Sequence, residues 1–312
     1  CSTKEEREII EGLKAGRIRA RTLSDKEGAI ASFEQVLDLS PGQPDALSFL
    51  AEAYTESSSW DHLVALYEDQ LKAGLRGEAE HGVLLQIAMV HWKMREAPEA
   101  AEPHFDRLRR VEPTNGAMLS YFREVLTARD DTQKLTQVLS DAQRATQDAA
   151  LKKELGSEIA ALAEKGDNAG KAIEQYKSIL KSDPNDAPAR DALKRLYGQG
   201  GNYPALVDML RQDLDRLPAD DKAQKAAVLR EMAGVYRDRV KNEQQLVQVL
   251  QQLLQLDESD EAALRELVNI YESLGRFRDL LSCQQKLADL TSDADEKAEL
   301  FRAVARRWGE QF

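Results

Sequence analysis

Histidine and cysteine are the side chains here that could bind a metal or act as nucleophiles, and their spacing disfavours both kinds of chemistry. The histidines, His62, His81, His91 and His104, show no HExxH or other short ligand spacing, and no cysteine lies near them. His81 and His91 are ten residues apart, about three helical turns, which is too far for one metal ion. The many Glu and Asp pairs define no pocket for acid or base catalysis. We therefore predict no enzyme, no metal and no cofactor.

Two short motifs look like ligand-binding loops but have simpler explanations. GQGGNY, residues 198–203, has the glycines of a phosphate loop, but no preceding strand and no Lys-Ser/Thr pair. We interpret it as a turn in which glycine lets two helices reverse. DESDE, residues 257–261, lacks the glycine and the spacing of a calcium loop. We expect its carboxylates to favour the N-terminus of the helix that follows.

Charge and composition exclude several classes of protein. A formal net charge of −12 opposes non-specific binding to nucleic acid or to an anionic membrane, since both would repel the chain as a whole. No run of about 18 apolar residues occurs, so we expect no membrane-spanning helix. A hydrophobic content of 42% is too high for a disordered chain. Cys1 and Cys283 are too few and too far apart for a disulfide framework, and we expect Cys283 to pack as a small hydrophobe.

The elements that must position any site are amphipathic helices, and residues 261–290 show them most clearly. Apolar residues recur there at i, i+3, i+4 and i+7 on both sides of a turn at Gly275. A helical hairpin of this size cannot bury its apolar stripe alone, so it needs similar hairpins beside it. The stripes are Leu264, Leu267, Val268 and Tyr271 in the first helix, and Leu280, Leu281, Leu287 and Leu290 in the second.

The rest of the chain supplies such hairpins at regular intervals. Equivalent positions are separated by 34, 38, 34, 37, 34, 40 and 34 residues, which indicates a paired unit of roughly 72 residues. The longer intervals coincide with polar connections such as residues 216–229 and 289–300, and we expect their extra residues to enlarge loops. The equivalent positions are Ala29, Leu63, Ala101, Leu135, Ala172, Leu206, Leu246 and Leu280.

In this pattern the chain resembles the tetratricopeptide repeat family over nearly its whole length. The family's closing proline is present as Pro41, Pro113 and Pro184. Its aromatic position in the first helix, helix A, reads Ala20, Tyr54, Trp92, Leu126, Ala163, Tyr197, Tyr236, Tyr271 and Trp308. Its aromatic position in the second helix, helix B, reads Phe33, Tyr67, Phe105, Leu139, Tyr176, Leu210, Leu250 and Gln284.

The resemblance implies an all-α fold, a right-handed α-solenoid (superhelix) of about eight helical hairpins plus a terminal helix. We expect one solenoid over residues 1–312, with hairpins at roughly 4–40, 44–74, 82–112, 116–147, 150–183, 187–217, 222–257 and 260–291, and a terminal helix at 295–312. Some residues depart from the family, which prefers small side chains at their positions. For these we expect looser packing, or long side chains that reach outward to solvent. They are Arg17, Arg123 and Lys194 on helices A, and Gln70 and Asp213 on helices B.

The resemblance also indicates where a partner would bind, because positions 2, 5, 9 and 12 of helix A line the family's concave surface. Early repeats place Asp45, Ser48 and Glu52 there, whereas the last three gather arginines. Arg265 followed by Asn269 is similar to the basic-then-Asn pair of the family's carboxylate clamps, but the neighbouring repeat lacks the matching Asn. We predict that this basic patch binds an acidic or C-terminal peptide segment of another protein. The alternative is a solvated face whose arginines have Glu partners on adjacent turns. The patch is Arg230, Arg237, Arg265, Asn269, Arg302 and Arg306.

The first residue suggests a location. Bacterial lipoproteins begin, after removal of the signal peptide, at a cysteine that carries the lipid, and CSTKEER is similar to such a start. We therefore expect lipidation of Cys1 and a cell-envelope interaction scaffold that assists assembly of a pilus, secretion or motility machine. The alternatives are an internal segment of a long cytoplasmic adaptor, or a regulatory domain of an enzyme whose catalytic part is absent here.

Overall fold

The structure, a computed structural model, describes residues 4–311, and in that part of the chain it contains helices and turns but no strand. The predicted all-α fold is therefore confirmed. Cys1 lies outside the described residues, as does Phe312. The chain divides into two compact units, Cys1–Asn168 and Ala169–Phe312, and each is described by itself. One continuous right-handed solenoid over the whole chain stays a prediction.

The first unit holds nine α-helices and one π-helical segment among its described residues. They are α1 (Lys4–Arg21), α2 (Lys26–Leu39), α3 (Pro44–Glu56), α4 (Trp60–Lys72), α5 (Glu78–Met89), η1 (Val90–Met94), α6 (Pro98–Val111), α7 (Gly116–Ala128), α8 (Thr132–Ala145) and α9 (Ala149–Lys165). The first helix of the third hairpin thus begins at Glu78 rather than at residue 82.

The second unit continues the alternation. Its described elements are α10 (Ala169–Ser182), α11 (Ala187–Gln199), α12 (Tyr203–Arg216), α13 (Lys222–Val235), η2 (Tyr236–Val240), α14 (Glu243–Leu256), α15 (Glu261–Ser273), α16 (Phe277–Leu290) and α17 (Ala294–Gln311). Odd-numbered helices are the helices A of the repeat, and even-numbered helices are its helices B.

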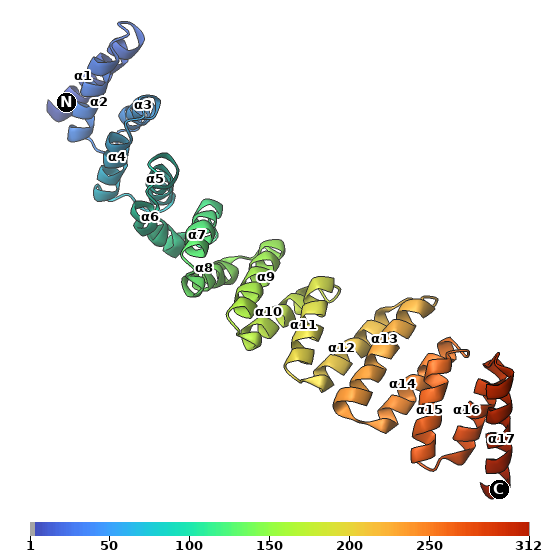
Figure 1. Ribbon diagram of the computed structural model, residues 1–312. Coiled ribbons are helices and arrows are strands. Elements are labelled where there is room, and N and C mark those ends of the chain that lie inside the picture. Colours follow the sequence, from blue (N-terminus) through green and yellow to red (C-terminus); the bar gives the residue numbers. More distant parts are fainter. Residues whose placement is uncertain (1–3, 312) are drawn as a thin grey trace. The chain divides into compact units, whose positions relative to one another are not determined.

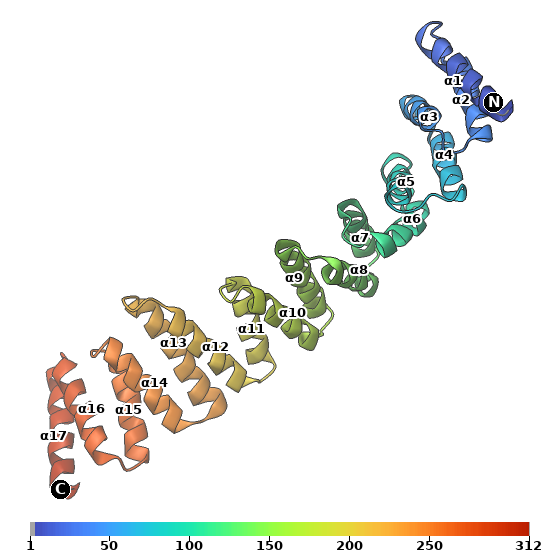
Figure 2. The same cartoon turned by 180° about the vertical axis from the view of Figure 1, so that it is seen from behind.

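Within each unit, a helix packs chiefly against the helices that precede and follow it in the chain. In the first unit α3, α5, α7 and α9 lie along one side and α4, α6 and α8 along the other, as both views show (Figures 1 and 2). Each unit is therefore an α-solenoid of stacked hairpins. Its core is a series of shared layers between neighbouring hairpins, which is how a repeat buries a stripe that one hairpin alone would expose.

Most aromatic positions of the repeat fill this core, whereas Trp308 on α17 is exposed. Tyr54, Trp92, Tyr197, Tyr236 and Tyr271 on helices A are all buried. Their helix B counterparts include Phe105, which stacks on the ring of Tyr121 with 4.4 Å between the ring centroids. The sequence pattern predicted buried rings at repeated positions. Each hairpin therefore needs few aromatic residues, and the rest of its core is aliphatic.

Alternate hairpins differ in the length of helix A, and this corrects one expectation. The α-helices α3, α7, α11 and α15 have 13 residues each, whereas α9 has 17. In α5 and α13 the helix is prolonged by the five-residue π segments η1 and η2. The extra residues of the longer intervals therefore lengthen helices rather than loops, because π turns accommodate inserted residues within a helix.

Each turn between helix A and helix B contains one residue with a positive φ, in the left-handed region. Gly201 has φ of 70° and Gly275 has φ of 66°, so the interpretation of GQGGNY as a helix-reversing turn is confirmed. Asp260 of the DESDE stretch caps α15 by accepting the Ala263 N–H at 3.0 Å, as expected for a carboxylate there. The same turn elsewhere uses residues other than glycine, namely Ser24, Ser58, Glu96, Asp130, Asp167 and Lys241.

Three residues that depart from the small-residue pattern, Gln70, Lys194 and Asp213, are largely buried, which corrects the expectation that they reach outward or pack loosely. Asp213 accepts hydrogen bonds from Arg190 Nε at 2.6 Å and lies 2.9 Å from Lys194 Nζ. Two departures from the pattern, Lys194 and Asp213, thus pair with each other across one hairpin. Gln70 is buried at 3% exposure. Long polar side chains replace small ones here because each charged one finds a partner within the stack.

Candidate binding surface

The predicted basic patch lies on the helices A of the second unit, and three of its arginines hold carboxylates. Arg230 on α13 donates to Asp260 at 2.8 Å. Arg237 on η2 donates through Nε and Nη2 to the two oxygens of Glu266, at 2.5 and 2.6 Å. Each acceptor lies at or near the following helix A. These ion pairs, the arginine ladder, join successive helices A along their shared face.

The next rung involves Arg265 on α15, which donates to Glu296 at 2.8 Å. Hydrogen bonding to Glu296 and Glu266 raises the pKa of Arg265 and of Arg237, respectively. Both arginine side chains are about half exposed, so each rung contributes no more than about 1 kcal/mol to stability. These ion pairs therefore neutralise charge more than they stabilise the fold. Their carboxylates lie mainly on the following helix A, rather than on adjacent turns of the arginine's own helix.

Arg302 and Arg306 on α17 differ from the other arginines of the patch. Both are exposed, and neither forms an ion pair with a side chain of residues 4–309. Asn269 on α15 is also exposed, and no hydrogen bond of its side chain falls within that range. The structure thus divides the predicted site into arginines with intramolecular partners and two arginines at the last helix A whose guanidinium groups face solvent.

The first unit carries a similar ladder. Lys93 on η1 lies 3.3 Å from Glu124 on α7. Arg123 on α7 donates to Glu158 at 2.9 Å and to Glu154 at 3.1 Å, both on α9. Arg123 is one of the departures from the small-residue pattern, so its length serves to reach the next helix A. A cation bound forward to the next repeat is a recurrent feature of this face in both units.

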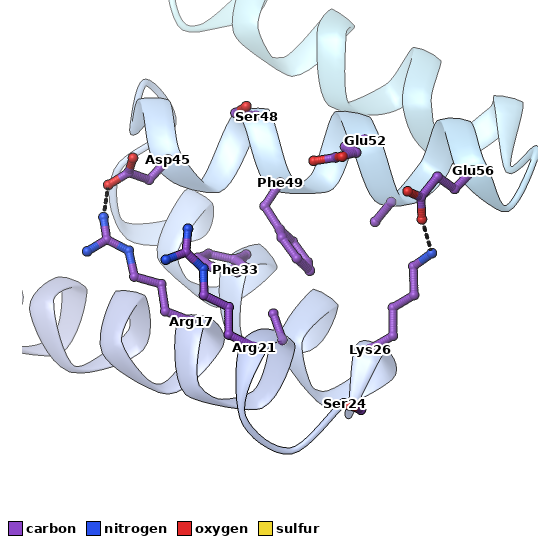
Figure 3. A pocket seen from close by; sticks show the side chains of 12 residues that line it. Arg17, Arg21, Ser24, Lys26, Phe33, Asp45, Ser48, Phe49, Glu52 and Glu56 are labelled. Atoms are coloured by element: carbon purple, nitrogen blue, oxygen red, sulfur yellow. Dashed lines mark hydrogen bonds and ion pairs between the residues drawn. The ribbon is translucent and has the colours of Figure 1, made fainter.

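A groove between α1 and α3 in the first unit has a volume of about 850 Å³ (Figure 3). Two ion pairs cross it near its ends: Arg17 with Asp45, and Lys26 with Glu56 at 2.6 Å. Its lining residues are Arg17, Ala20, Arg21, Ser24, Lys26, Phe33, Asp45, Ser48, Phe49, Glu52, Ala53 and Glu56.

Between these ion pairs the groove presents an aromatic floor and two unpaired charges. The rings of Phe33 and Phe49 are 4.5 Å apart between centroids. Arg21 on α1 and Glu52 on α3 are exposed, and neither has an ion pair in the part of the chain that the structure describes. Figure 3 shows Arg21 extending from the α1 wall toward α3, and Glu52 on the α3 wall. The arrangement can bind opposite charges on either side of an apolar group.

The repeat pattern predicts the α3 wall of this groove, and on the α1 wall it singles out Arg17 but not Arg21. Asp45, Ser48 and Glu52 were mapped to the inner face, and all three line the groove. Arg21 and Phe49 were not singled out. Position 12 of the first helix A falls on Arg21, one residue after Ala20, so the same mapping applied to the first hairpin was the available signal. Nothing in the sequence marked Phe49 as a floor rather than a core residue.

Two histidines that are distant in the sequence lie side by side in the structure. His91 on η1 and His104 on α6 stack with ring centroids 5.8 Å apart, and burial lowers the pKa of both. Among the described residues, no group of three or more His, Cys, Asp or Glu side chains is placed to hold a metal ion. No helix among them combines the length and the apolar character needed to cross a membrane. Cys283 is buried in the core of the second unit.

Comparisons with known proteins agree with the repeat pattern. The family model described as tetratricopeptide repeat matches residues 46–80, a stretch that includes α4 and most of α3. No curated protein matches the sequence.

Several solved structures match the chain. One is YrrB, described as a TPR protein with an unusual peptide-binding site (16% identity, 62% of this chain, 98% of that chain, TM-score 0.34). Another is the TPR domain of P58(IPK) (11% identity, 97% of this chain, 98% of that chain, TM-score 0.29). A third is a thermophilic TPR protein of Thermus thermophilus (18% identity, 60% of this chain, 98% of that chain, TM-score 0.26).

Proposed function

We propose that this tetratricopeptide repeat protein is a non-enzymatic scaffold that binds an acidic or C-terminal peptide segment of another protein through α17. The observation that supports the proposal is the pair of solvent-facing arginines, Arg302 and Arg306. Every earlier arginine of the patch binds a carboxylate 29 to 31 residues further along the chain. Arg302 occupies the same repeat position as Arg265, so it presents a guanidinium in the geometry that holds a carboxylate elsewhere.

The chemistry of guanidinium groups sets the class of partner. Arginine binds carboxylates through paired hydrogen bonds, and two arginines one helical turn apart match two carboxylates of one peptide. The overall charge of −12 would repel an acidic peptide at long range, so binding must depend on this local patch. Affinity should therefore fall as salt is added, because both groups of each new ion pair lie near solvent.

Fluorescence anisotropy tests this proposal with a defined probe. The probe is a fluorescein-labelled twelve-residue Asp/Glu-rich peptide with a free C-terminal carboxylate, and its control has Asn and Gln in place of the acids. We expect the acidic peptide alone to bind, and Arg302→Glu with Arg306→Glu to weaken it about tenfold or more. The control variant, Arg216→Glu with Lys286→Glu on helices B, makes the same change in net charge and should bind normally. Equal loss in both variants, or equal binding of both peptides, contradicts the proposal.

The finer part of the proposal is an envelope lipoprotein that helps assemble a pilus, secretion or motility machine. It is supported only by Cys1 and the polar residues that follow it in the sequence. The intact mass of the protein purified from its natural source tests this part. An added mass of acyl chains on Cys1 supports a lipid anchor, and an unmodified Cys1 contradicts it.

A further inference from the structure

We propose that the groove between α1 and α3 is a second docking site, for a peptide segment in which an apolar or aromatic side chain lies between an acidic and a basic residue. The proposal rests on the scaffold function but concerns a different surface from α17. Four features of the groove support it: its floor, its fixed ends, its unpaired charges and their placement on opposite walls (Figure 3).

The floor is apolar and held in place from below. Phe33 is only 2% exposed, and a Cβ added at Gly16 would lie 2.8 Å from two of its ring atoms. Helix α1 therefore packs directly on this ring because Gly16 has no side chain. Phe49 lies over Phe33 and is only half-buried. An apolar side chain that covered Phe49 would remove the remaining exposed ring surface from water, which is favourable.

The ends of the groove are electrically neutral. Arg17 pairs with Asp45 at one end and Lys26 pairs with Glu56 at the other, so each pair joins the α1–α2 hairpin to α3. All four side chains are about half exposed or more. They neutralise the ends and leave the middle as the place where a ligand's charges would find partners.

The middle of the groove is dipolar. Arg21 extends from the α1 wall and Glu52 from the α3 wall, and neither has an ion-pair partner in the described part of the chain. A purely acidic peptide would meet Glu52, and a purely basic one would meet Arg21. A segment with one acidic and one basic residue satisfies both, and its intervening side chain then lies over Phe49. This differs from α17, where the two free charges are both cationic.

Selection from a phage-displayed library of random twelve-residue peptides tests the assignment. Wild-type protein is the target, and selected peptides are synthesised and measured by anisotropy. The informative variant is the exchange Arg21→Glu with Glu52→Arg, which keeps the net charge and the exposed location of both residues. Phe49→Ala removes the upper ring of the floor, and circular dichroism with thermal unfolding verifies that each variant folds.

We expect enriched peptides to carry an acidic and a basic residue on either side of an aliphatic or aromatic one. The charge exchange should weaken them about tenfold and select peptides with the two charges in reversed order. Arg302→Glu with Arg306→Glu should leave them unchanged, which separates this site from the one on α17. Failure to enrich any such peptide, or peptides whose binding the groove variants do not alter, overturns the groove proposal while leaving the test at α17 intact.

Discussion

Arg17 and Lys194 occupy the same position of helix A in two different hairpins, yet their carboxylate partners lie in different places. Lys194 in the second unit binds Asp213 on the helix B of its own hairpin, and the two side chains are 21% and 18% exposed. Arg17 in the first unit binds Asp45 on the next hairpin, and both side chains are more than half exposed. The position of the carboxylate decides the outcome. A partner within the hairpin gives a buried cross-link, and a partner on the next hairpin gives the rim of an open groove.

The largest effect we predict comes from neutralising the buried cluster. Asp213→Asn keeps the shape of the side chain but removes the carboxylate that pairs with the buried Arg190, and it leaves Lys194 with only the exposed Asp191 as a counter-charge. Loss of one partner of a buried ion pair costs about 3–5 kcal/mol. Urea unfolding, followed by hydrogen exchange in the second unit, measures the loss. A change no larger than that of an exposed rung would contradict the structural role of the cluster.

A smaller effect is expected where the groove floor meets α1. Gly16→Ala places a methyl group 2.8 Å from the ring of Phe33, so the ring or the helix must shift. Overpacking of this kind costs about 1–3 kcal/mol. Gly82→Ala is the matched control, because Gly82 also lies within a helix, α5, and a Cβ there meets nothing within 4 Å. Thermal unfolding of both variants checks the difference, and equal melting temperatures would show that the floor is not tightly packed.

Acid should destabilise the first unit through the stacked histidines His91 and His104, whose burial disfavours their protonated form. Burial lowers the pKa of His91 and His104; Arg95 lowers that of His91 further, and His91 lowers that of His104. The unfolded chain, with histidine pKa near the usual value of about 6.5, therefore binds protons more readily than the folded chain. Stability should fall as pH drops from about 7 through about 6. Urea midpoints at successive pH values measure this, and His104→Gln should flatten the dependence. If the urea midpoint of that variant depends on pH as steeply as that of the wild type, groups other than this histidine pair cause the acid sensitivity.

The smallest effect is predicted for the exposed ion pair between Arg17 and Asp45 at one end of the groove. Asp45→Asn removes the partner of Arg17, but both side chains remain in contact with water. We expect a loss below about 1 kcal/mol, because exposed ion pairs contribute little. The urea midpoint of this variant, compared with that of Asp213→Asn, measures the contrast between the two regions. A loss of several kcal/mol would place Arg17 among the structural cross-links.

The sequence was sufficient for the fold because its signal is repeated. Tyr54, Tyr197 and Tyr271 recur at one position of helix A, and each is buried where the pattern predicted. The lengthening of alternate helices A was missed, since a π segment such as η1 has no distinctive residue pattern. Within the polar connections, residues 222–229 and 294–300 looked like loop insertions, although they form the start of α13 and α17.

The candidate sites were predictable only in part, because charge pairing between hairpins depends on distances that periodicity does not give. Arg237 was correctly placed on a helix A, but its bidentate contact with Glu266 could not be read from two residues 29 apart. Lys194 and Asp213 were recognised as departures from the family, and only the structure shows that they face each other. The position of Arg21 on the inner face could be predicted from the repeat pattern, but its lack of an ion-pair partner could not.

Site-specific photo-crosslinking tests most directly whether this chain is a scaffold that binds other proteins along its helices A. The photoreactive residue p-benzoylphenylalanine would replace Ser48, an exposed residue in the groove, or Ala65, an exposed residue on helix B α4. The protein would be irradiated in its source cells. The account predicts discrete protein adducts from position 48, reduced by Arg21→Glu with Glu52→Arg, and few from position 65. Equal labelling from both positions, or no protein adduct from position 48, would contradict it.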